Sequence, residues 1–223
     1  MLRASSEGSR RVKIYMFEHY SLCFRVRMAA ALKSQHLQEV AVLDDDTETM
    51  TKLAGKRVIP ILVKNDGEPM LESMDMVKYI EAQGEPLFQG PERDEIAKWA
   101  EEAVRRTAPL TMPRYPLLAL PEFATVAALS HYQVRKRKVF GDFTELLART
   151  RTLISELRPE LEALDRLIEN PAAINGTLSF DDIRVLPLLR SAAIVKGLQF
   201  PSKVRAYFET MMERIGYSPL PAI

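Results

Sequence analysis

The sequence predicts a small mixed α/β domain followed by an all-helical domain. Strand-like and helix-like segments alternate over residues 12–84, and beyond residue 94 apolar residues recur at helical spacing only. Glycine and proline cluster between these two patterns, which is typical of a linker. We therefore expect a flexible lead at residues 1–11, a first domain at residues 12–84, a linker at residues 85–93 and a helical domain at residues 94–223.

Each element of the first domain has its own signal. Residues 12–17 form an apolar, strand-like run, and residues 22–32 have helical spacing that leaves Arg25, Arg27 and Lys33 on the exposed face. The remaining predicted elements are a strand at 40–43, a helix at 47–53 capped by the acidic run at 44–46, a strand at 59–63, a strand at 70–71 after the turn signal at 65–67, and a helix at 73–83. This order suits one compact mixed sheet.

The second domain is predicted from longer helical patterns. One helix spans residues 94–106 before Pro109, and one apolar stripe spans residues 143–168, where Pro159 marks a bend or a break. Ser179 and Asp182 have the spacing of a capping box at the start of a helix. The basic run at 135–138 is expected to be a solvated helix end, and the last helix covers residues 202–215.

Composition limits the classes of partner. The 31 Lys and Arg residues balance the 30 Asp and Glu residues, so no overall charge attracts nucleic acid or an anionic membrane. No apolar run reaches the length of a membrane-spanning helix. The single cysteine, Cys23, excludes an internal disulfide and favours a reducing cytoplasm, and the three histidines lack metal-ligand spacing. We expect a cytoplasmic protein with no metal, nucleic-acid or membrane partner.

The turn between the first strand and the first helix is the first candidate site. Free backbone N–H groups at a helix N-terminus favour an anion and acidify a nearby thiol or hydroxyl. Tyr20 and Ser21 stand at the mouth of this turn, and Cys23 lies about one helical turn further in. The alternative is structural: Ser21 is an ordinary N-cap and Cys23 fills the core.

Two further positions are candidates for ligand binding. Pro60 opens a strand, and if the bond before it is cis, the backbone of Ile59 can offer its N–H and C=O to an extended peptide. At the start of the next predicted helix, Ser73 can bind a carboxylate while Glu72 binds an ammonium group, as an α-amino-acid head group requires. The alternative for Ser73 is a simple helix cap.

Seven segments carry a resemblance to known proteins when taken in order. They are residues 17–28, 45–49, 58–62, 71–79, 175–183, 187–190 and 221–223. Together they resemble the glutathione-transferase-like fold, in which a thioredoxin-like domain is joined to an all-α domain. The sequence is most similar to the bacterial two-domain glutaredoxin 2 family, whose members are glutathione-dependent thiol–disulfide oxidoreductases.

The resemblance implies a role for each candidate residue. Pro60 would be a cis-proline, and Ile59 would pair with the cysteinyl backbone of glutathione, the co-substrate. Glu72 and Ser73 would hold its γ-glutamyl group, and Arg57 is a candidate for its glycyl carboxylate. In the family the active turn reads Cys-Pro-Tyr-Cys, whereas this chain has Tyr20, Ser21, Leu22 and Cys23.

Three functions are compatible with a turn that lacks the outer, nucleophilic cysteine. An oxidoreductase would act on glutathionylated proteins with Cys23 as an impaired or monothiol nucleophile. A glutathione transferase would use Tyr20 or Ser21 to activate the glutathione thiol toward small electrophiles. A non-enzymatic glutathione sensor or partner-binding protein would keep the binding site without the chemistry.

Overall fold

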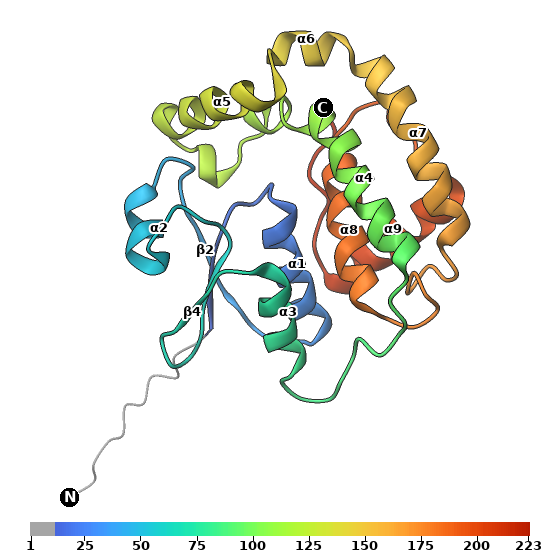
Figure 1. Cartoon of the computed structure of the whole chain (residues 1–223), viewed down its shortest axis with the longest axis horizontal. Helices are drawn as coiled ribbons and strands as arrows, with labels where there is room; N and C mark the ends of the chain where they lie inside the picture. The colour runs from blue at the N-terminus through green and yellow to red at the C-terminus, as the bar shows by residue number, and fades with distance from the viewer. Residues whose placement is uncertain (1–11) are drawn as a thin grey trace, which may run out of the picture.

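The computed structural model describes residues 12–223, so the flexible lead predicted at residues 1–11 lies outside the described residues. A small sheet with its helices forms one side of the molecule, and a group of helices forms the other side (Figure 1). Within residues 12–223, every helix is too short or too polar to cross a membrane.

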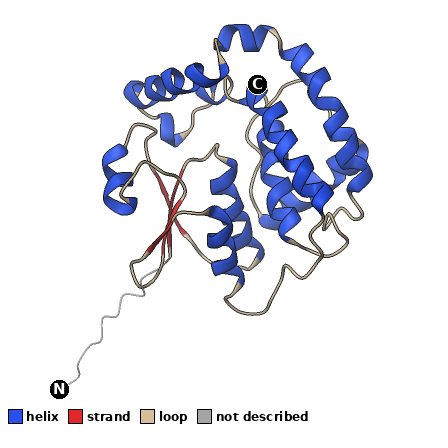
Figure 2. Ribbon diagram, in the orientation of Figure 1, coloured by secondary structure: helices blue, strands red, loops and turns tan. Residues whose placement is uncertain are grey.

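The sheet, drawn in red in Figure 2, has four strands. Their order is β2-β1-β3-β4. Their bounds are β1 Lys13–Met16, β2 Gln38–Ala41, β3 Ile61–Val63 and β4 Pro69–Met70. Strand β2 is parallel to β1, whereas β3 is antiparallel to both β1 and β4. Ile14 lies opposite Leu62 in the register, and both side chains are fully buried, so the apolar runs of the sequence form the centre of the sheet.

Three helices cover the sheet: α1 Ser21–Leu32, α2 Thr47–Ala54 and α3 Ser73–Glu81. Helices α1 and α3 pack together on the side that faces the helical half, and α2 lies on the other side (Figure 1). Of the acidic run, only Asp46 caps α2, where its side chain accepts a hydrogen bond from the Thr49 N–H at 2.9 Å. Asp44 is buried and has a different role.

The helical half differs from its predicted outline in three places. Its elements are α4 Asp94–Thr111, the 3-10 turns η1 Tyr115–Leu117 and η2 Pro121–Phe123, α5 Val126–Phe140, α6 Phe143–Ala148, α7 Thr150–Leu167, α8 Phe180–Ala192 and α9 Ser202–Ile215. Helix α4 continues through Pro109, and of α5 only the basic end at 135–138 was predicted, because only Ala128 and Tyr132 of its residues are buried. The predicted stripe at 143–168 is two helices rather than one.

The break in that stripe falls at Arg149, not at Pro159, which lies inside α7. Next to the break, the Thr150 hydroxyl donates to the carbonyl oxygen of Leu147 and accepts a hydrogen bond from Arg114 at 2.8 Å. These side-chain bonds replace helical ones at the corner, as hydroxyl side chains commonly do.

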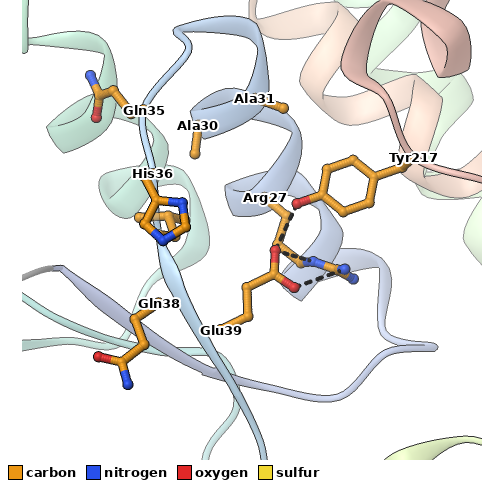
Figure 3. Close-up of a pocket in the computed structure, with 9 residues that line it drawn as sticks. Arg27, Ala30, Ala31, Gln35, His36, Gln38, Glu39 and Tyr217 are labelled. Carbon is orange, nitrogen blue, oxygen red and sulfur yellow. Dashed lines mark hydrogen bonds and ion pairs between the residues drawn. The ribbon is translucent and has the colours of Figure 1, made fainter.

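Buried charges join the two halves. Helix α8 packs on α1, and Arg190 of α8 binds both the carbonyl oxygen and the carboxylate of Glu18. The expectation that Arg27 is exposed was wrong: its guanidinium is buried between the carboxylates of Glu18 and Glu39. Tyr217, from the segment after α9, covers Arg27 with its ring and donates to Glu39 at 2.6 Å, beside a cavity of about 450 Å³ (Figure 3). The segment after α9 therefore contacts the edge strand β2 through Glu39.

Candidate functional site

The turn before α1 places tyrosine and cysteine in different environments. Tyr20 is the N-cap residue, is partly exposed and makes no capping hydrogen bond with its side chain. Ser21 is the first helical residue, so the alternative that Ser21 is the N-cap was wrong. Cys23 is fully buried and accepts a hydrogen bond from the Phe17 N–H at 3.4 Å. The thiol is part of the core and faces away from solvent.

Burial controls the ionisation of both groups. Burial raises the pKa of the Cys23 thiol far above its ordinary value, and the Phe17 N–H only partly offsets this effect. Burial also raises the pKa of Tyr20, with a smaller contribution from Cys23. At neutral pH Tyr20 therefore keeps its proton and can donate a hydrogen bond, whereas Cys23 has almost no thiolate to act as a nucleophile.

The loop before β3 has the conformation that the resemblance implied. The Ile59–Pro60 peptide bond is cis. Among residues 12–223, neither the N–H nor the C=O of Ile59 makes a backbone hydrogen bond outside the regular elements. These groups can pair with an extended peptide laid along the loop.

A cavity of about 240 Å³ lies between this loop, the Tyr20 turn and α5. Three predicted site residues form part of its wall: Tyr20, Arg57 and Ile59. The full wall consists of Phe17, His19, Tyr20, Asp44, Arg57, Val58, Ile59, Arg135 and Lys136. The wall thus combines aromatic groups with three cations and one carboxylate.

Asp44 holds cationic side chains of the cavity wall in place. Its carboxylate is fully buried and lies 2.7 Å from His131 Nδ1 and 2.8 Å from Arg135 Nη2, both on α5. Arg57 Nη2 donates to the Asp44 carbonyl oxygen at 2.8 Å. The interpretation of the basic run at 135–138 as a solvated helix end was therefore wrong for Arg135. This residue of α5 binds the buried carboxylate of Asp44, which belongs to the other half of the chain.

A second buried carboxylate, that of Glu122, holds the aromatic side of the Tyr20 turn through His19. His19 Nδ1 lies 2.5 Å from Glu122 Oε1, and the His19 backbone N–H donates to the same oxygen at 3.0 Å. Burial alone would raise the pKa of Glu122, but the hydrogen bonds and charge of His19 outweigh it and lower that pKa. The ring of His19 also contacts those of Tyr115 and Phe123, so the residue before Tyr20 is held from both halves of the chain.

Glu72 and Ser73 are among the predicted residues that lie outside this wall. Glu72 is exposed and is the N-cap residue of α3, with no side-chain capping bond, and Ser73 is the first residue of the helix and is buried. The expectation that Ser73 is the cap was therefore wrong by one position. Both residues stand at the N-terminus of α3, where free N–H groups favour an anion.

Sequence reasoning missed the residues that come from distant segments. These are His19, Asp44, Glu122, His131, Arg135 and Lys136. No local pattern links them, because the pairs they form join positions about 90 to 100 residues apart. Among residues 12–223, no group of three or more His, Cys, Asp and Glu side chains could hold a metal ion.

Comparison with known proteins covers both halves of the chain. The family model described as "Glutathione S-transferase, N-terminal domain" matches residues 6–87, and "Glutaredoxin 2, C terminal domain" matches residues 95–218. The Escherichia coli (strain K12) protein named Glutaredoxin 2 is 37% identical over 204 residues, which are 91% of this chain and 95% of that protein.

Solved structures agree with these matches. Glutaredoxin 2 from Salmonella typhimurium, in complex with glutathione, is 34% identical with a TM-score of 0.91, covering 95% of this chain and 98% of that one. A glutathione transferase from Phanerochaete chrysosporium is 14% identical with a TM-score of 0.67, covering 93% and 97% of the chains, and shares the fold. The chain thus has a thioredoxin-like domain followed by a helical domain, and it is 37% identical to the Escherichia coli protein over 91% of its length. The chain therefore belongs to the glutaredoxin 2 family.

Proposed function

We propose that this chain binds glutathione in the cavity beside Tyr20 and that glutathione supplies the reactive thiol. The observation that carries the proposal is that Ile59 lines that cavity and, among residues 12–223, leaves its backbone N–H and C=O without backbone hydrogen bonds outside the regular elements. The Salmonella relative, which is described in complex with glutathione, supports the same ligand. The single cysteine fits a reducing, cytoplasmic compartment.

The proposed binding mode assigns each part of glutathione to one part of the site. The Ile59 backbone pairs with the cysteinyl residue and directs its sulfur toward Tyr20. Glu72 and the N-terminus of α3 at Ser73 bind the γ-glutamyl ammonium and carboxylate. Arg57, two residues before Ile59, receives the glycyl end.

The favoured chemistry is transfer of glutathione to a small electrophile. Tyr20 keeps its proton because its pKa is raised, so it can donate a hydrogen bond to the thiolate of bound glutathione and stabilise it. The thiolate then attacks the electrophile and displaces a leaving group. Ser21 is a second candidate donor, since it is partly exposed in the same turn.

Thiol–disulfide exchange on glutathionylated proteins is the second candidate because it is the activity of the family. It would need Cys23 to leave the core, since a buried thiol of raised pKa is a poor nucleophile. The cost of exposing that thiol disfavours this route in the parent protein.

Calorimetry with glutathione tests the binding, and two activity assays separate the chemistries. We expect binding at millimolar or lower concentration, and arylation of glutathione that falls about 10- to 100-fold in Tyr20→Phe, the loss typical of a hydrogen bond to a charged group. Reduction of a glutathionylated peptide that disappears in Cys23→Ser would support the family's redox reaction instead. Binding without either activity would indicate a sensor, and no binding would contradict the proposal.

A further inference from the structure

Lys136 is a cation without an ion-pair partner among the described residues. It lies on α5 in the wall of the 240 Å³ cavity and is partly buried against the ring of Tyr132. Within residues 12–223, no carboxylate comes within ion-pair distance of its Nζ atom. Burial, followed by the nearby charge of Arg135, lowers the pKa of Lys136, and the charge of Asp44 offsets this only in part.

The charges around Lys136 do not balance. Arg57, Arg135 and Lys136 line the cavity together with one carboxylate, that of Asp44. Asp44 already accepts hydrogen bonds from His131 and Arg135 and lies 3.4 Å from Arg57. Three cations against one saturated carboxylate leave about two positive charges facing the cavity, which favours an anionic group inside it.

We propose that Arg135 and Lys136 of α5, together with Arg57, bind the glycyl carboxylate of glutathione, so that the helical half supplies part of the glutathione site. This inference rests on the proposed function. It adds two residues from the far half of the chain to a site that the sequence resemblance confines to the first half.

The geometry of the wall selects the glycyl carboxylate over the γ-glutamyl one. Arg57 lies in the same wall as Ile59, which pairs with the cysteinyl residue in the proposed mode, and Arg57 shares the Asp44 carboxylate with Arg135 of α5. With the sulfur at Tyr20, the glycine extends toward Arg57 and the cations of α5. The γ-glutamyl group goes instead to Glu72 and Ser73, which lie outside this cavity.

Asp44 has a positioning role in this arrangement. A guanidinium presents several N–H groups, so Arg135 can hold Asp44 with one edge and still face the cavity with another. Lys136 has no such second task among the described residues, which makes it the better residue to change. Its loss should leave the Asp44 contacts and the fold unaffected.

The test combines one change in the protein with one change in the ligand. Calorimetry compares glutathione with its glycyl monoethyl ester, in which a neutral ethyl ester replaces the glycyl carboxylate. The proteins compared are the parent, Lys136→Met, Lys136→Arg and Lys138→Met. Lys138 is a matched control because it is an exposed lysine of the same helix outside the cavity wall.

We expect the parent protein to bind glutathione about 3- to 10-fold more tightly than the ester, the gain of one partly buried charged pair. Lys136→Met should lose most of that preference, because its affinity for glutathione falls while its affinity for the ester stays the same. Lys136→Arg and Lys138→Met should keep it. Raised salt should reduce the preference in the parent, because screening weakens a partly exposed ion pair.

Two results would overturn the inference, and they are distinguishable from each other. If glutathione binds but the ester binds equally well, or if Lys136→Met keeps the full preference, the α5 cations do not hold the glycyl carboxylate while the proposed function stands. If neither ligand binds the parent protein, the proposed function fails together with the inference.

Discussion

Position 20 shows how the loss of one thiol changes the chemistry that this turn can perform. The helix N-terminus, the cis-proline loop and the adjacent cavity are all present around Tyr20. A phenol cannot form a mixed disulfide, and burial raises its pKa further from neutrality. The turn can therefore stabilise a thiolate that belongs to another molecule, but it does not supply one in an accessible position.

Restoring a thiol at this position should restore redox activity. We expect Tyr20→Cys to raise the rate of reduction of glutathione mixed disulfides by about 100-fold or more, because a cysteine at a helix N-terminus is acidified and accessible. A coupled assay with a glutathionylated peptide measures the rate, and Tyr20→Ser is the control for loss of the ring. Equal rates in the cysteine and serine variants would show that the turn does not activate a thiol.

The thiol of Cys23 should be unreactive while the protein is folded. Because Cys23 is fully buried and its pKa is raised, we expect alkylation or reaction with a disulfide reagent at pH 8 to be at least about 100-fold slower than in denaturant. Mass spectrometry of the labelled chain measures this ratio. Fast labelling of the folded protein would mean that the N-terminus of α1 opens readily, and it would favour the redox route.

At the scale of elements, the sequence predicted best where the signal is local. Helix α9 has the predicted bounds, and the capping box at the start of α8 is present as the spacing of Ser179 and Asp182 indicated. Only the basic end of helix α5 was predicted, because most of its residues face solvent or the cavity rather than a continuous core. The helix predicted to stop before Pro109 continues through it as α4, because packing of the apolar face outweighs one lost hydrogen bond.

The two residues of the capping box should differ in their effect on stability. Asp182 accepts from the N–H groups of Ser179 and Ile174 and from the Tyr207 hydroxyl, all within 3 Å. Ser179→Ala removes a cap and should lower the free energy of unfolding by about 1 kcal/mol. Asp182→Ala leaves three buried donors unpaired and should cost about 3 kcal/mol or more.

Denaturant unfolding monitored by circular dichroism measures both losses. Ser155→Ala is a suitable control, because its hydroxyl is exposed on α7 and bonds only a helical carbonyl oxygen. Glutathione binding by the folded fraction should be unchanged in both capping-box variants. Equal losses in the two variants would show that the Ile174 and Tyr207 bonds contribute little.

At the scale of the whole molecule, distant charges decide how the halves meet. Glu18 with Arg190, Asp44 with Arg135 and Glu122 with His19 each join residues far apart in the chain. A single sequence gives no signal for such pairs, since each partner looks like an ordinary surface charge. For this reason the first-half residues of the site could be predicted, whereas the α5 wall and the support of His19 could not.

The contact between Glu122 and His19 should make the stability of the folded protein depend on pH in the acidic range. The pKa of Glu122 lies below its ordinary value of 4.5 in the folded protein, because the hydrogen bonds and charge of His19 outweigh the opposing effect of burial. A carboxyl whose pKa is lowered by folding contributes stability above its unfolded pKa, and this contribution is lost as the pH falls through the folded value. The pair should therefore act fully at pH 6 and fade below about pH 4.5.

Glu122→Gln isolates this contribution, since the amide keeps an oxygen that can accept the His19 N–H but carries no charge. We expect the parent to be more stable than this variant by about 1 to 3 kcal/mol at pH 6, the usual value of a hydrogen bond to a buried charged group. The difference should shrink as the pH falls below about 4.5, because the parent then loses the same charge. Denaturant unfolding from pH 7 to pH 3.5 measures it, with exposed Glu145→Gln as the control. A difference that stays constant over this range would show that Glu122 is not ionised in the folded protein.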